Sequence, residues 1–170
     1  MTRGGREKGN MGRTDSASLV VDAPLHRVYA ALIEPQALLK WLPPDGMSGR
    51  FEHFDARTGG SYRMRLTYAE APESGGKSSA DSDVVDVRFV EIVPDERVVQ
   101  AADFESDDPS FAGTMTMTWS VTAVSAGSTR VDIRADDVPT GISAEDHVKG
   151  LRSSLTNLAA YLSQPAVEQD

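Results

Sequence analysis

The sequence predicts an α+β fold in which a curved antiparallel sheet of about seven strands wraps around one long C-terminal helix. Three observations predict it. Apolar residues recur at every second position through much of the middle of the chain, which is typical of strands with one buried face. Two short helical segments follow the first strand, and a longer apolar stripe at helical spacing ends the chain. Consecutive strands with helices at the two ends favour an antiparallel sheet over a parallel one.

The first strand is predicted at Ser18–Val21, and a short helix follows it. Asp22 is expected to cap that helix, with Pro24 in its first turn. The helix then presents one apolar face: Leu25, Val28, Tyr29 and Leu32. Pro35 ends this helix and begins a second one, because proline is tolerated in the first turn of a helix but not in its interior.

The alternation of apolar and polar residues is clearest in three segments: Tyr62–Tyr68, Met115–Val121 and Thr129–Arg134. Val84–Val93 is more continuously apolar, and Pro94–Glu96 turns it into a further strand at Arg97–Ala102. The segment Glu70–Asp83 is rich in Ser, Gly and Asp, which predicts a mobile loop between strands.

The last helix is predicted at Ser143–Leu162. Ser143 and Asp146 have the spacing of a capping box, with Asp in place of the usual Glu. An apolar stripe follows: Val148, Leu151, Leu155, Leu158 and Leu162. We therefore expect this helix to lie across the apolar face of the sheet.

One domain is predicted at residues 14–163, between a disordered tail at 1–13 and a short C-terminal tail at 164–170. Either Met1 or Met11 could begin the protein. The sequence contains no cysteine, no apolar secretion signal after Met1 and no run of about 18 apolar residues. We therefore expect a cytoplasmic protein without disulfides or a membrane span.

The charge argues against nucleic acid as a partner. The formal net charge is −9, to which residues 1–13 contribute +3 and the remainder −12. Residues 14–170 are acidic enough to repel the phosphate backbone of nucleic acid, and the sequence has no basic stripe with interleaved aromatic residues.

Several short motifs occur in a fixed order along the domain. Ala23–Pro24 and Val28–Leu32 precede Pro35–Trp41, which has the pattern Pro-x-x-Leu-x-x-Trp. Asp55–Gly60 has the pattern Asp-x-Arg-x-Gly-Gly, and Glu91–Arg97 has the pattern Glu-x-x-Pro-x-x-Arg. In these motifs the sequence resembles the family named for homologues of the heat-shock-protein-90 ATPase activator, within the START-related lipid-transport superfamily. The resemblance covers roughly residues 17–163 and implies the helix-grip fold.

The sequence departs from the family pattern at two places. Leu42 stands where a second tryptophan usually follows Trp41, and Gly150–Leu151 stands where Gly-Trp is usual. Both changes remove an aromatic side chain from near the cavity that the resemblance implies.

No motif of a conventional active site is present. His26, His53 and His147 lack metal-binding spacing, and there is no nucleophile elbow, phosphate-binding loop or dinucleotide fingerprint. We expect neither a metal nor a cofactor. His26 and His147 are expected on the surface, whereas His53 lies in a strand beside Phe51 and Phe54 and is a candidate functional residue.

The helix-grip fold implies a cavity between the sheet and the last helix, on the order of 300–1,000 Å³. Inward-facing strand residues, with neighbours on the helices, are the candidates for its lining, while Arg63 and Arg65 are expected on the solvated face. The candidate ligand-binding residues are Trp41, Phe51, His53, Tyr62, Met64, Leu66, Tyr68, Phe89, Asp103, Met115, Met117, Trp119, Leu151 and Leu155.

The favoured hypothesis is binding of a hydrophobic or lipid-like small molecule. One alternative, implied by relatives on this fold, is an enzyme of polyketide cyclase or dehydratase type, for which His53 and Asp103 are the candidate acid–base groups. The other is a protein-interaction module that modulates a chaperone ATPase. Polar groups inside the cavity would favour the enzyme, and a filled core would favour the interaction module.

Overall fold

A computed structural model of the chain describes residues 13–43, 46–68, 82–104 and 107–163. The elements are β1 (Arg13–Val21), α2 (Leu25–Ile33), α3 (Pro35–Trp41), β2 (Met47–Phe54), β3 (Ser61–Tyr68), β4 (Ser82–Val93), β5 (Arg97–Phe104), η1 (Pro109–Phe111), β6 (Met115–Ser125), β7 (Ser128–Val138) and α4 (Ala144–Ser163). The strands form one seven-stranded sheet in the order β1-β7-β6-β5-β4-β3-β2. Every neighbouring pair is antiparallel, so the predicted α+β helix-grip fold is confirmed.

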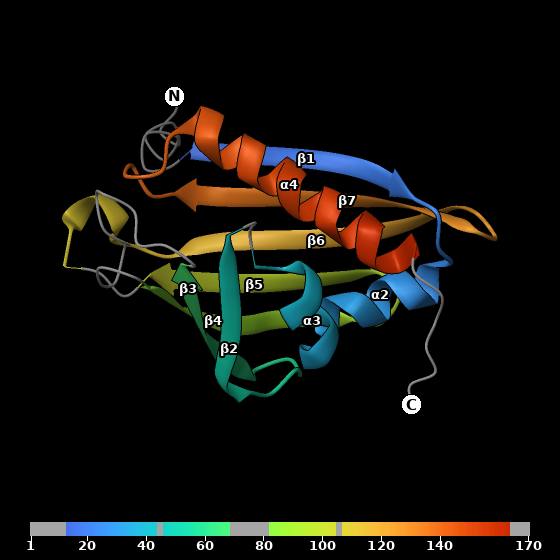
Figure 1. Ribbon diagram of the computed structural model, residues 1–170, viewed down its shortest axis with the longest axis horizontal. Helices are drawn as coiled ribbons and strands as arrows, with labels where there is room; N and C mark the ends of the chain where they lie inside the picture. The colour runs from blue at the N-terminus through green and yellow to red at the C-terminus, as the bar shows by residue number, and fades with distance from the viewer. Residues whose placement is uncertain (1–12, 44–45, 69–81, 105–106, 164–170) are drawn as a thin grey trace, which may run out of the picture.

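The sheet is curved, and the helices cover one of its faces (Figure 1). Five strands run side by side from β1 to β4, whereas β3 and β2 turn steeply away from their direction. α4 lies diagonally across this face, and α2 and α3 lie beside the C-terminal half of α4 (Figure 1). The helices therefore cover a concave face.

The two short helices begin and end near prolines, but the predicted cap of the first is wrong. Pro24, not Asp22, is the N-cap residue of α2, with an extended backbone and no side-chain cap. Glu34 ends α2 and also precedes Pro35, the first residue of α3. The predicted break at Pro35 is confirmed.

The first strand is longer than predicted, because pairing with β7 extends it to Arg13. Arg13 pairs with Val138, one residue before the expected domain boundary at 14. Of the tails predicted at 1–13 and 164–170, Arg13 belongs to β1, and the other residues lie outside the described part of the chain. So does most of the predicted loop, but its last residues belong to β4, and Asp83 is buried.

The turn between β2 and β3 shows why Asp55–Gly60 ends in two glycines. Gly59 adopts a positive φ of 88°, and a Cβ on Gly60 would lie 2.2 Å from the Asp55 carbonyl oxygen. The turn also rests on β4, because the Gly59 N–H donates to the Phe89 carbonyl and the Phe89 N–H donates to the Gly60 carbonyl.

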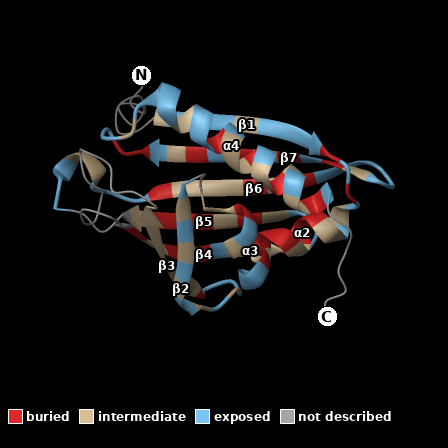
Figure 2. Cartoon of the chain, viewed as in Figure 1, coloured by how far each residue is buried: buried red, intermediate tan, exposed pale blue. Residues whose placement is uncertain are grey.

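α4 begins with the predicted cap. The Ser143 hydroxyl accepts a hydrogen bond from the Asp146 N–H at 3.1 Å, while Asp146 itself lies in the acidic first turn. Of the predicted stripe, Val148 is half-buried, and the remaining members are buried: Leu151, Leu155, Leu158 and Leu162. The core lies between this stripe, α2, α3 and the inner face of the strands (Figure 2).

Replacing Leu158 by alanine should lower the free energy of unfolding by about 2–5 kcal/mol, because Leu158 is fully buried and the smaller side chain leaves a cavity in the core. Thr156→Ala is the matched control, since Thr156 is exposed on the same helix and its loss should cost within about 0.5 kcal/mol. Urea unfolding measures both free energies. Equal effects of the two substitutions would contradict the docking of α4.

Candidate ligand cavity

A cavity of about 260 Å³ lies between the sheet and the helices, and it is partly open. Its lining is mostly apolar, with a few polar residues: Leu32, Leu38, Trp41, Leu42, Tyr62, Met64, Leu66, Asp83, Val85, Val87, Gln100, Ala102, Met115, Met117, Trp119, His147, Gly150, Leu151 and Ser154.

Strands β3 to β6 form the floor of the cavity. Cross-strand pairing aligns Tyr62 with Val87, Val87 with Ala102, and Ala102 with Met115. Residues paired across a sheet share a face, so this row points to the helices. The period-two pattern placed the inward residues of β3 and β6 correctly: Tyr62, Met64, Leu66, Met115, Met117 and Trp119 all line the cavity.

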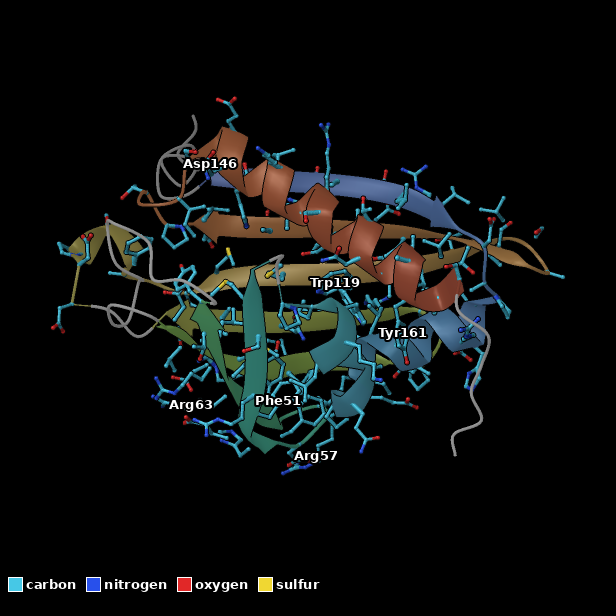
Figure 3. All side chains as sticks on the ribbon, in the orientation of Figure 1. Phe51, Arg57, Arg63, Trp119, Asp146 and Tyr161 are labelled. Atoms are coloured by element: carbon cyan, nitrogen blue, oxygen red, sulfur yellow. The ribbon has the colours of Figure 1, made fainter. Side chains whose placement is uncertain are left out.

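Two tryptophans make one wall. The rings of Trp41 on α3 and Trp119 on β6 meet edge to face, with centroids 5.4 Å apart and an interplanar angle of 77°. The Trp41 Nε1–H donates to the Ala31 carbonyl at 3.0 Å, which holds its ring in place. Figure 3 shows Trp119 between the sheet and the helices, whereas Arg57 and Arg63 lie at the periphery.

His147 is the main correction to the sequence analysis, which expected it on the surface. Its side chain is only 13% exposed, it lines the cavity, and its Nδ1 lies 2.7 Å from Oδ2 of Asp15. Asp15 is 4% exposed and also accepts from Arg13, whose Nη2 donates to the Ile142 carbonyl as well. These contacts join the beginning of α4 to β1.

The Asp15 carboxylate is held in its charged form. The hydrogen bond from Arg13, more than that from His147, lowers the pKa of Asp15 below its ordinary value, against the opposing effect of burial. Because Nδ1 of His147 is engaged by Asp15, Nε2 is the ring nitrogen left for a group in the cavity.

Tyr68, which is half-buried, and Asp83, which is buried, form a second polar pair. The Tyr68 hydroxyl donates to Oδ2 of Asp83 at 2.9 Å. Burial first, and then this hydrogen bond, raises the pKa of Tyr68 to about 12. Tyr68, a predicted lining residue, does not line the cavity. Asp83, the residue to which Tyr68 donates, lines it instead.

Three more predicted candidates pack in the core and do not line the cavity. Phe51 and Phe89 belong to an aromatic cluster with Phe54 and Tyr62, in which the Phe51 and Tyr62 centroids are 5.1 Å apart and those of Phe54 and Phe89 are 5.9 Å apart. Leu155 is buried against the sheet. Phe51 and Phe89 both contact the ring of Tyr62, which does line the cavity.

The two candidate catalytic residues, His53 and Asp103, lie on the outer face. A bulge between Phe51 and His53 shifts the register, so His53 pairs with Arg63 and its Nε2 contacts the Ser61 hydroxyl at 3.0 Å. Asp103 accepts from Arg88 at 2.7 Å and from Thr114 at 2.6 Å. The acid–base assignment to these two residues is therefore wrong.

Among the residues that the structure describes, no group of three or more His, Asp or Glu side chains is arranged to hold a metal ion. Within the same residues, no helix has the length and apolar character needed to cross a membrane.

The chain was compared with known protein families. The family described as "Activator of Hsp90 ATPase homolog 1-like protein" matches residues 22–163. The chain belongs to this family. No protein of curated function matches. The predicted resemblance is confirmed, and the match begins at the first helix and ends with α4.

Solved structures of this fold come from several bacteria. Protein CV1439 from Chromobacterium violaceum is 33% identical, with 89% of this chain and 97% of that chain covered and a TM-score of 0.77. Protein MLL2253 from Mesorhizobium loti is 16% identical, with 91% and 100% covered and a TM-score of 0.69. DynU16, from the dynemicin biosynthetic locus, is 20% identical, with 89% and 47% covered and a TM-score of 0.63. The last two share the fold alone.

The two departures from the family pattern both border the cavity. Leu42, Gly150 and Leu151 are all lining residues, and a Cβ on Gly150 would meet no heavy atom within 4 Å. Smaller side chains at these positions leave more of the cavity open than two tryptophans would.

Asp15→Asn should lower the free energy of unfolding at neutral pH by roughly 1–3 kcal/mol, since a buried charged acceptor of two hydrogen bonds is lost. The pKa of Asp15 is lower in the folded state than in the unfolded state. The carboxylate therefore contributes fully to the free energy of unfolding above the unfolded-state pKa of about 4, and this contribution is lost as the pH falls through the folded-state pKa. The difference from the parent should therefore shrink on acidification below about pH 4.

Asp132→Asn is the matched control, because its partner Arg130 lies two residues away on the same exposed strand face. Chemical unfolding at several pH values measures both variants. If Asp15→Asn lowers the free energy of unfolding at pH 7 by no more than Asp132→Asn does, the stabilising role of the Asp15 carboxylate is contradicted.

Proposed function

We propose that the protein binds a predominantly apolar small molecule in the cavity between the sheet and α4. The observation that carries the proposal is the unfilled apolar lining. Four lining residues remain only half-buried although their neighbours in the core are buried: Leu42, Leu66, Val85 and Met117. Covering such surface gains about 25 cal/mol per Å² before the costs of association.

The size of the cavity limits the ligand. About 260 Å³ lies just below the range of roughly 300–1,000 Å³ typical of pockets for drug-sized molecules. A compact molecule of one to three rings, or a short lipid-like metabolite, suits this volume. Sensing, carrying or sequestering such a molecule in the cytoplasm is the use we propose, the absence of cysteine being in keeping with a reducing compartment.

A second candidate is acid–base catalysis on a bound molecule, and one observation favours it. His147 lines the cavity with its Nδ1 held by Asp15, an arrangement that orients an imidazole for proton transfer through Nε2. The fold shared with DynU16 adds no residue to this argument. The interaction-module alternative is disfavoured, because a cavity takes the place of the filled core that it requires.

Binding is tested with N-phenyl-1-naphthylamine, a neutral apolar dye whose emission rises in apolar surroundings. The parent protein should bind it with saturable affinity, and the emission of Trp41 and Trp119 should change as the site fills, since both indoles line it. Met117→Trp should abolish dye binding at small cost in stability, because a cavity accepts added volume.

Val124→Trp is the matched control, being an equally large addition on the exposed end of the same strand. It should leave dye binding unchanged. If Met117→Trp unfolds the protein and the parent binds no dye, the inner strand residues are ordinary core packing and the proposed function is wrong.

A further inference from the structure

Most buried polar side chains of the described chain have a partner in the protein. Four polar or charged residues are buried: Asp15, Asp83, Gln100 and Thr129. Asp15 is bound by Arg13 and His147, Asp83 accepts from Tyr68, and the Thr129 hydroxyl donates to the Ala23 carbonyl at 2.8 Å. No hydrogen bond joins the side-chain amide of Gln100 to another described residue, although Gln100 is only 7% exposed.

The hydroxyl of Tyr62 is in the same condition. Tyr62 is 4% exposed, and its ring is held among Phe51, Phe54 and Phe89, but within the described part of the chain its hydroxyl has no hydrogen-bond partner. Burial alone raises the pKa of this phenol, as expected where no acceptor or charge is nearby. Both polar groups can therefore hydrogen-bond to a molecule in the cavity that Tyr62 and Gln100 line.

Both groups belong to the floor of the cavity. Tyr62 on β3 and Gln100 on β5 are separated by β4, which corresponds to two strand spacings or about 10 Å. Tyr62 aligns through Val87 with Ala102, and Gln100 is the next inward residue on β5 after Ala102. The short side chain of Ala102 leaves space between the two polar groups, so one molecule lying over Val87 and Ala102 can reach both.

The charges around the cavity select the kind of molecule. No Lys or Arg is among the described residues that line it. Its ionisable members, Asp83 and His147, are already bonded to Tyr68 and Asp15. The imidazole of His147 already faces the Asp15 carboxylate, so a carboxylate or sulfonate would meet no unpaired cation among the described lining residues. In a protein of net charge −9, desolvation would oppose its binding.

We propose that the ligand is a neutral molecule carrying a hydrogen-bond-accepting oxygen, of the ketone, ester, amide or alcohol class, which accepts from the Tyr62 hydroxyl, while a second polar atom of the same molecule contacts the Gln100 side-chain amide. This rests on the proposed function and names the ligand class of the same cavity. The apolar lining supplies affinity, and the two polar groups orient the molecule.

Three dyes separate charge from hydrogen bonding. 6-Propionyl-2-dimethylaminonaphthalene is a neutral ketone, N-phenyl-1-naphthylamine is neutral without a carbonyl, and 1-anilinonaphthalene-8-sulfonate adds one negative charge to the latter. The parent protein should bind both neutral dyes and should bind the sulfonate at least about tenfold more weakly than its neutral counterpart.

Tyr62→Phe should weaken binding of the ketone about three- to tenfold and leave the amine dye within about twofold, because the substitution removes only the hydroxyl. The emission of the bound ketone should also move to shorter wavelength as its carbonyl loses a donor. Gln100→Leu should weaken the ketone likewise. Tyr161→Phe is the matched control, since Tyr161 lies on α4 outside the lining and Figure 3 shows it near α2.

Thermal unfolding without dye distinguishes a ligand-binding hydroxyl from a structural one. Tyr62→Phe should keep or raise the melting temperature, because the hydroxyl that it removes makes no hydrogen bond to another described residue. A lowered melting temperature with equal weakening of both neutral dyes would overturn the proposal. Equal binding of all three dyes, unaffected by Tyr62→Phe and Gln100→Leu, would also overturn it while leaving the proposed function intact. Failure of the parent to bind any neutral dye would overturn both.

Discussion

The packing of one helix on a curved sheet is the constraint on which the rest of this structure depends. Leu155, Leu158 and Leu162, in the C-terminal half of α4, are fully buried and are not among the residues that line the ligand cavity. The part of α4 before Leu155 supplies His147, Gly150, Leu151 and Ser154 to the lining instead. A helix curves only gently, so it can pack closely on a strongly concave surface along only part of its length. The cavity is the space that remains under the other part.

Polar contacts hold α4 where apolar packing is incomplete. Ser143 caps its first turn, Asp15 binds His147, and Arg13 donates to the Ile142 carbonyl just before the helix. Together they attach the beginning of the helix to β1, the edge strand that α4 crosses (Figure 1). The beginning of α4, which lines the cavity, is thus held by charged hydrogen bonds, which are more directional than hydrophobic packing.

The two faces of the sheet carry different kinds of side chain. On the outer face, ion pairs such as Arg88 with Asp103 and Arg130 with Asp132 lie in solvent, where each contributes little to stability. The inner face holds aromatic, methionine and aliphatic side chains, and few polar groups. Of these few, Tyr62 and Gln100 lack partners among the described residues, which makes them the groups best suited to recognise a ligand.

The sequence by itself determined the order of elements, the break at Pro35, the buried stripe of α4 and the inward residues of β3 and β6. All of these follow from local periodicity and from proline chemistry. Gln100 also faces inward, but the sequence did not predict it as a lining residue, because its strand, β5, has no clear alternation of polar and apolar residues. Only the tertiary structure decided the remainder: the bulge that turns His53 outward, and the pairing of His147 with Asp15 across 132 positions of the sequence. Periodicity states which face a residue occupies; it does not state which distant residue meets it there, or how much space the curvature of the sheet leaves between them.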